Sequence, residues 1–113
     1  MHEMSLAESI IQIVEEVAER EQAKRVKSVS IEIGELSSVQ TDSLTFCFDA
    51  VTKGSVAEGA VFTLIPVPGT GWCMKCCAEV GLKEALGECP VCGSHQVQIT
   101  GGTEMRVKEL ELE

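Results

Sequence analysis

The first strong pattern along the chain is an amphipathic helix over residues 4–22. Apolar side chains recur there at helical spacing, at Leu6, Ile10, Ile13, Val14 and Val17. The segment from Ser5 to Glu8 has the Ser-x-x-Glu form of a capping box, in which the two side chains satisfy free backbone N–H groups. We therefore expect the helix to begin near Ser5, after an extended lead-in formed by residues 1–4.

Alternation of apolar and polar residues predicts a strand over residues 26–34. Thr41-Asp42 then offers an N-cap for a second helix over residues 42–53, and Gly54 can end it. The expected buried face of this helix consists of Leu44, Cys47, Phe48 and Val51. For Cys47, this position indicates core packing rather than chemistry.

After a second strand, expected over residues 60–67, the chain changes character. Prolines and glycines between residues 66 and 71 mark a boundary, and over residues 72–95 the cysteines appear and the periodicity fades. A short strand is expected around residues 97–99. A last strand runs to Leu112, and its alternation slips by one residue, so we expect a bulge near Lys108-Glu109.

These elements predict an α+β fold: a small sheet covered by two helices, with an inserted four-cysteine module of the zinc-ribbon type. We expect two domains. Residues 1–68 and 97–113 would form the α/β domain, and residues 69–96 would form the inserted metal-binding domain.

Charge and hydropathy narrow the range of functions. The 113 residues include 18 acidic and 9 basic side chains, for a formal net charge of -9. Binding along a phosphate backbone needs clustered Lys and Arg, which this chain lacks. No run approaches the roughly 18 apolar residues of a membrane helix, and nothing resembles a secretory signal. We therefore expect a cytoplasmic protein that binds neither nucleic acid nor membrane.

Four of the six cysteines form two Cys-x-x-Cys pairs, Cys73 with Cys76 and Cys89 with Cys92. In a cytosolic protein such pairs indicate metal. Two knuckles of this kind bring four thiolates to one tetrahedral Zn(II), at Zn–S distances of about 2.3 Å. Four thiolates leave no open coordination position, so we expect a structural zinc. Two disulfides, or an iron site of the rubredoxin type, are the alternatives.

Two neighbouring residues could also reach this site. Cys77 follows Cys76 directly, but the two-residue spacing from Cys73 favours Cys76 as the ligand. His95 lies close enough in sequence to approach the metal, and we interpret it as a surface residue or a neighbour of the ligands.

Met1-His2-Glu3 is the second candidate metal site. The α-amine, the backbone nitrogen of His2 and the His2 imidazole can close fused chelate rings around one ion, and Ni(II) suits such nitrogen donors in a square-planar arrangement. The amide or the carboxylate of Glu3 could fill the next position. The amine must be free and the imidazole neutral, so affinity should fall as the pH drops through the histidine range.

These features together resemble the HypA/HybF family of hydrogenase nickel-insertion proteins. The resemblance rests on Met1-His2-Glu3, on residues 33–37 (Ile-Gly-Glu-Leu-Ser), 46–49 (Phe-Cys-Phe-Asp) and 54–59 (Gly-Ser-Val-Ala-Glu-Gly), and on the paired knuckles. It covers nearly the whole chain, in order and spacing. Cys77 departs from the family pattern near the knuckles and leaves the zinc assignment slightly open.

The resemblance implies a nickel-delivery protein and not an enzyme. It assigns nickel to His2, with Glu3 as a candidate second residue, and structural zinc to Cys73, Cys76, Cys89 and Cys92. It also implies two partners, a HypB-type GTPase and the large-subunit precursor of nickel–iron hydrogenase, with urease served by some members. The domain formed by residues 1–68 and 97–113 would then be the nickel-binding one.

The alternative function is a zinc-ribbon module that binds nucleic acid or another protein. A nucleic-acid module would need basic and aromatic residues around its knuckles. Residues 72–95 contain two lysines against three glutamates, and Trp72 is their only aromatic residue. A thiol oxidoreductase that uses one Cys-x-x-Cys is a further rival, which the pairing of the two motifs disfavours.

Overall fold

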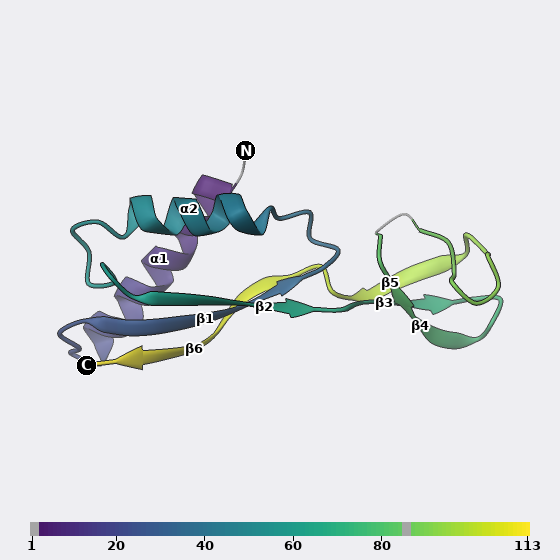
Figure 1. Ribbon diagram of the computed structural model, residues 1–113. Coiled ribbons are helices and arrows are strands. Elements are labelled where there is room, and N and C mark those ends of the chain that lie inside the picture. Colours follow the sequence, from purple (N-terminus) through teal and green to yellow (C-terminus); the bar gives the residue numbers. More distant parts are fainter. Residues whose placement is uncertain (1–2, 85–86) are drawn as a thin grey trace. The chain divides into compact units, whose positions relative to one another are not determined.

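The structure is a computed structural model that describes residues 3–84 and 87–113. Its described elements are α1 (Glu3–Arg20), β1 (Val26–Gly34), α2 (Thr41–Val51), β2 (Val61–Val67), β3 (Gly69–Cys73), β4 (Ala78–Leu82), β5 (Val97–Gly101) and β6 (Met105–Leu112). The strands form two three-stranded sheets, in the orders β2-β1-β6 and β4-β3-β5 (Figure 1). The predicted α+β class and its two helices are confirmed, but the sequence predicted one sheet where the structure has two. In the part of the chain that the structure describes, no helix is both long enough and apolar enough to cross a bilayer.

The chain divides into two compact units. The first contains the residues up to Ile31, together with Val39–Leu64 and Val107–Glu113. The second contains Glu32–Ser38 and Ile65–Arg106, and so includes the segment predicted to hold the metal. The limits predicted for the two domains stay a prediction.

In the first unit, α1 and α2 cover one face of the strands (Figure 1). The buried residues of α1 repeat at spacings of three and four, which places them on one side of the helix; they are Ala7, Ile10, Ile11, Val14 and Ala18. From α2, Leu44, Cys47 and Phe48 are buried, which confirms Cys47 as a core residue. The ring of Phe48 stacks on Phe62 of β2 with ring centroids 4.4 Å apart.

The start of α1 differs from the prediction. The helix already includes Glu3, so Ser5 lies inside it and is no N-cap, and the extended lead-in is wrong for Glu3 and Met4. Met1 and His2 lie outside the described residues. The buried face of α1 is also rotated about the helix axis relative to the predicted one. Ile13 is 46% exposed, whereas Ile11, which the prediction left out, is 4% exposed.

The second helix begins one residue earlier than predicted and ends two residues earlier. Its N-cap is Gln40, which makes no side-chain capping bond, so the predicted N-cap at Thr41-Asp42 is wrong. At the other end, the Thr52 hydroxyl and the Thr52 backbone N–H both donate to the carbonyl of Phe48. These two bonds satisfy a terminal helix carbonyl before Gly54 is reached.

The second unit holds β3 and β4, which the sequence did not predict. β3 pairs antiparallel with β4 and with β5, so it is the central strand of its sheet. Both strands contain glycines, which contribute neither an apolar nor a polar side chain. The alternating pattern that predicts a strand from sequence is therefore missing from β3 and β4. The buried core of this unit consists of Leu36, Cys73, Val80, Leu82 and Cys89, with Cys76 and Val97 packed against it.

Candidate metal centre

Each Cys-x-x-Cys pair lies on a tight turn, and the two turns are built alike. In the first, the backbone N–H of Cys77 donates to the carbonyl of Cys73 at 2.8 Å, and in the second the N–H of Gly93 donates to the carbonyl of Cys89, also at 2.8 Å. The residue that closes each turn has positive φ, +53° at Cys77 and +74° at Gly93. The chain therefore folds back after each second cysteine and directs both sulfurs of a pair to the same side.

Backbone donors also point at the sulfur atoms. The N–H of Cys76 donates to Sγ of Cys73 at 3.3 Å, and the N–H of Val91 donates to Sγ of Cys89 at 3.4 Å. Hydrogen bonds of this kind favour a negatively charged sulfur, as metal ligation requires. The cysteine spacing alone does not reveal these donors, but Pro90 and Gly93 are residues that favour the tight turn which directs the Val91 N–H.

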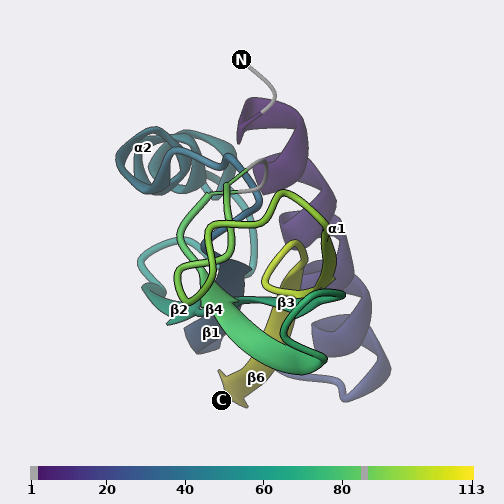
Figure 2. The same ribbon diagram turned by 90° about the vertical axis from the view of Figure 1, so that its right-hand side faces the viewer.

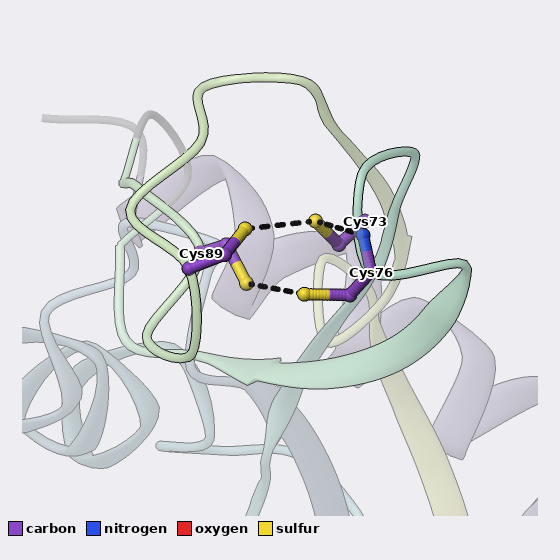
Figure 3. A group of neighbouring side chains, drawn as sticks. Cys73, Cys76 and Cys89 are labelled. Carbon is purple, nitrogen blue, oxygen red and sulfur yellow. Dashed lines mark hydrogen bonds between the residues drawn. The ribbon is translucent and has the colours of Figure 1, made fainter.

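The four sulfur atoms converge on one point. The Sγ atoms of Cys73, Cys76, Cys89 and Cys92 all lie within 4.8 Å of one another. Across the two knuckles, Cys73 lies 3.6 Å from Cys92 and Cys76 lies 3.9 Å from Cys89, the second contact being visible in Figure 3. A tetrahedral ion with metal–sulfur bonds of about 2.3 Å separates its ligands by about 3.8 Å. The donor set and its spacing therefore fit a single zinc ion.

None of the six cysteines forms a disulfide. The two close sulfur pairs, at 3.6 and 3.9 Å, are far longer than the bond of about 2.05 Å that a disulfide needs. The disulfide alternative is therefore wrong for this structure. The four thiols are therefore best suited to bind one soft or borderline metal ion together.

The site is part of the core of its unit. Cys73 and Cys89 are 0% and 2% exposed, whereas Cys92 is exposed. The buried side chains around them are few, and four of the seven cluster members named above are aliphatic. A metal bound here would link both knuckles to the strands. Its binding free energy would supply stability that a larger protein obtains from a more extensive apolar core.

Two of the thiols have shifted acidities. The pKa of Cys76 is raised to about 12, because its thiol shares hydrogen bonds with the sulfurs of Cys92 and Cys73 and is partly desolvated. The pKa of Cys89 is lowered to about 7 by the backbone N–H groups of Cys92 and Val91, against the opposing effect of burial. At neutral pH the metal-free site therefore retains protons, and zinc must displace them, so binding weakens as the pH falls.

The other two candidates lie outside this group. The Cys77 side chain is exposed, and its Sγ donates to the carbonyl of Met74 at 3.4 Å. His95 is exposed and is not among the residues whose ligand atoms converge. Within the described residues, this placement agrees with the interpretation of both as non-ligands.

The matched turns give a first testable prediction. Gly93→Ala places a side chain at positive φ, which costs about 1 kcal/mol, so zinc affinity should fall about fivefold. Cys77→Gly relieves the equivalent strain in the other turn and should leave zinc affinity unchanged or slightly higher. Competition with a chromophoric chelator measures both. Equal losses of zinc affinity in the two variants would show that backbone strain at these two positions does not affect zinc binding.

Of the predicted nickel residues, the structure describes only Glu3. This carboxylate belongs to the first residue of α1, which is 6% exposed. It accepts a hydrogen bond from the backbone N–H of Gln40 at 3.4 Å, and so it connects the start of α1 to the start of α2. A negative charge is favourable at a helix N-terminus, where the backbone dipole is positive. His2, the predicted nickel ligand, lies outside the described residues.

Comparison with known proteins identifies the family. A family model described as "Hydrogenase/urease nickel incorporation, metallochaperone, hypA" matches residues 1–112. The hydrogenase maturation factor HypA of Dechloromonas aromatica is 62% identical over 113 residues, and that of Albidiferax ferrireducens is 53% identical, with all of both chains covered in each case. The solution structure of the Ni metallochaperone HypA from Helicobacter pylori has a TM-score of 0.71 at 31% identity, covering 99% of this chain and 97% of that one.

These matches extend over both the helical unit and the four-cysteine site, and the family they name consists of maturation factors rather than enzymes. The chain therefore belongs to the HypA family of metallochaperones for nickel incorporation into hydrogenase and urease.

Proposed function

We propose that this protein binds one Ni(II) at its amino terminus and delivers it to the large-subunit precursor of a nickel–iron hydrogenase, in the cytoplasm. The observation that carries the proposal is the family match, which begins at residue 1 and so includes the amino-terminal candidate site as well as the knuckles. The relative from Helicobacter pylori is itself described as a nickel metallochaperone.

Nickel would be held by the α-amine, the backbone nitrogen of His2 and the His2 imidazole. These nitrogen donors form fused chelate rings, and they suit the square-planar preference of Ni(II). Glu3 would position the nickel site by holding the first turn of α1 in place. Because its buried carboxylate is bonded to the Gln40 N–H, the first turn of α1 is fixed to the segment that precedes α2.

Zinc would be held by Cys73, Cys76, Cys89 and Cys92, within the domain formed by residues 69–96. The fit rests on the sulfur spacing and on the all-thiolate donor set. Zinc would cross-link the two knuckles, and four thiolate ligands would leave no coordination position open for chemistry. The backbone N–H groups of Cys76 and Val91 orient the sulfurs and stabilise their charge.

Transfer would proceed by ligand exchange with a partner that docks beside the amino terminus. A HypB-type GTPase is the proposed partner, and its GTP hydrolysis would time the release. Urease is a second recipient that the family description allows. Protonation of the imidazole weakens nickel binding, so release becomes easier as the pH falls through the histidine range.

The test is a nickel titration of untagged protein and its His2→Ala variant. A change in the surroundings of a metal ligand already costs about 10–100-fold in affinity, so loss of the imidazole itself should weaken nickel binding by at least about 100-fold. An amino-terminal extension should have a similar effect, because it removes the free α-amine from its position beside His2. Calorimetry and the visible absorption of square-planar Ni(II) follow the binding.

His95→Ala is the matched control, because His95 is the other of the two histidines and is exposed. It should bind nickel as the wild type does, and all variants should retain one zinc per chain. Wild-type nickel affinity in His2→Ala would rule out the amino-terminal site.

A further inference from the structure

The outer face of the second sheet carries an exposed tryptophan. Trp72 lies in β3, the central strand, and is 41% exposed. β3 and β4 lie side by side in both views (Figures 1 and 2). Successive side chains of a strand point to opposite faces of the sheet. Because the next residue, Cys73, is buried in the core of this unit, Trp72 lies on the opposite face from that core.

Two polar side chains flank Trp72 across the sheet. Trp72 is paired with Glu79 of β4 on one side and with Gln98 of β5 on the other. Residues that are directly opposite each other share a face of the sheet, and neighbouring strands lie about 4.8 Å apart. Both flanking residues are exposed. A carboxylate and an amide therefore lie on either side of the indole.

The space next to this row is open. Gly81 is the next residue of β4 on the same face, and it is paired with Thr70 of β3. A Cβ built at Gly81 would have no atom within 4 Å. A glycine inside a strand often marks a place where a ligand approaches the backbone closely. Here it leaves room beside the indole and the carboxylate for a flat group.

Glu79 is not neutralised by a cation of its own chain. Within the described residues it forms no ion pair and no side-chain hydrogen bond. Lys83, which follows β4, is separated from Glu79 by about 13 Å of extended chain. Lys75 lies between β3 and β4 and forms no ion pair with the described residues either. The face therefore combines an aromatic ring with a free negative charge.

This combination suits the side chain of arginine. A guanidinium is planar, and it is attracted to the face of an indole when it lies within about 6 Å of the ring. It also presents its N–H groups as a fixed fork, from which a carboxylate accepts two hydrogen bonds together. The amide oxygen of Gln98 can accept another. Lysine has neither the flat surface nor the fork, so this face should prefer arginine.

We propose that the outer face of the β4-β3-β5 sheet binds an arginine side chain of a partner protein, with the guanidinium stacked on Trp72 and bonded to Glu79. Charge complementarity supports this occupant, because the chain has a formal net charge of -9 and so favours positively charged partner surfaces. One exposed stack and one exposed ion pair give weak binding, so the arginine serves as one anchor of a larger interface. This inference goes beyond the nickel-binding proposal and does not depend on it.

The test is a titration of the full-length, zinc-loaded protein with three capped tripeptides, which carry arginine, lysine or citrulline between two glycines. The arginine peptide should quench the emission of Trp72, the single tryptophan, and shift its indole N–H resonance. The lysine peptide should bind at least about threefold more weakly, because its ammonium cannot stack as a planar cation. Citrulline is flat but uncharged, so its peptide should bind more weakly than the arginine peptide as well.

Three variants separate the contributions. Glu79→Gln should weaken binding of the arginine peptide about fivefold, because the ion pair is lost. Trp72→Leu should abolish the preference for arginine over lysine, as followed by the amide resonances of Gly81 and Gln98. Glu84→Gln is the matched control, because it removes the same charge from an exposed position of the second unit beyond β4, and it should bind as the wild type does. All three should retain one zinc per chain.

The absence of any response to the arginine peptide overturns the proposal. Equal binding of the arginine and lysine peptides does so too, as does an affinity that Glu79→Gln leaves unchanged, because only general electrostatic attraction would then be acting. A neutral sugar such as maltose is the remaining comparison, since an exposed tryptophan between polar side chains also suits a sugar ring. A response to maltose without one to the arginine peptide would assign the face to sugars instead.

Discussion

Cys89→Ser should lose its bound zinc and, with it, the folded structure of the second unit. Cys89 is 2% exposed and belongs to the small core formed with Leu36, Val80 and Leu82. Structural zinc contributes about 10–16 kcal/mol to folding in zinc-finger peptides, so loss of a ligand removes more free energy than a core of this size can replace. The first unit has its own apolar core, and its helices should remain.

Metal analysis and tryptophan fluorescence follow this change directly. The wild type should contain one zinc per chain and Cys89→Ser much less. Trp72 is the single tryptophan and precedes Cys73, so its emission should report whether the second unit is folded. Cys77→Ser is the matched control, because the Cys77 thiol is exposed and bonds to a backbone carbonyl. A fully folded, zinc-loaded Cys89→Ser protein would contradict the four-thiolate site.

Gly34→Ala should be the most damaging substitution outside the cysteines. A Cβ at Gly34 would overlap the carbonyl oxygen of Gly102 and would lie 2.7 Å from the backbone nitrogen of Thr103. Neither group can rotate away, since both belong to the backbone, and the Gly102 carbonyl also accepts the Leu36 N–H at 2.8 Å. The end of β1 and the turn at Gly102-Thr103 must separate to admit the methyl group, and we expect a loss of about 3 kcal/mol or more in the free energy of unfolding.

Gly81→Ala provides the comparison for this effect. It adds the same methyl group to a strand of the second unit, but no atom lies within 4 Å of the new Cβ. Its free energy of unfolding should stay within about 0.5 kcal/mol of the wild type. Denaturant titration of both zinc-loaded variants decides the matter, and a Gly34→Ala protein as stable as Gly81→Ala would show that the backbone contact is not fixed.

The sequence by itself determined the elements whose signal is local. Apolar spacing was sufficient for α1 and α2. Alternation was sufficient for β1 and β6, and β-branched and aromatic side chains were sufficient for β2. The bulge expected near Lys108-Glu109 stays a prediction. The cysteine spacing was sufficient to predict which four sulfurs lie together, because a Cys-x-x-Cys turn orients its two sulfurs without help from the rest of the chain. The convergence of the four sulfurs agrees with that prediction.

Only the tertiary structure decided the features that depend on distant residues. Apolar residues of α1 extend around a wide arc, and packing alone selects Ile11 for the core and leaves Ile13 exposed. The start of α1 is bonded to Gln40, a residue far along the chain. β3 and β4 exist because they pair with each other and β3 pairs with β5, although their glycines give no alternating pattern. The physical reason is the same in each case: a local pattern fixes what a segment can form, and burial against a partner selects among the possibilities.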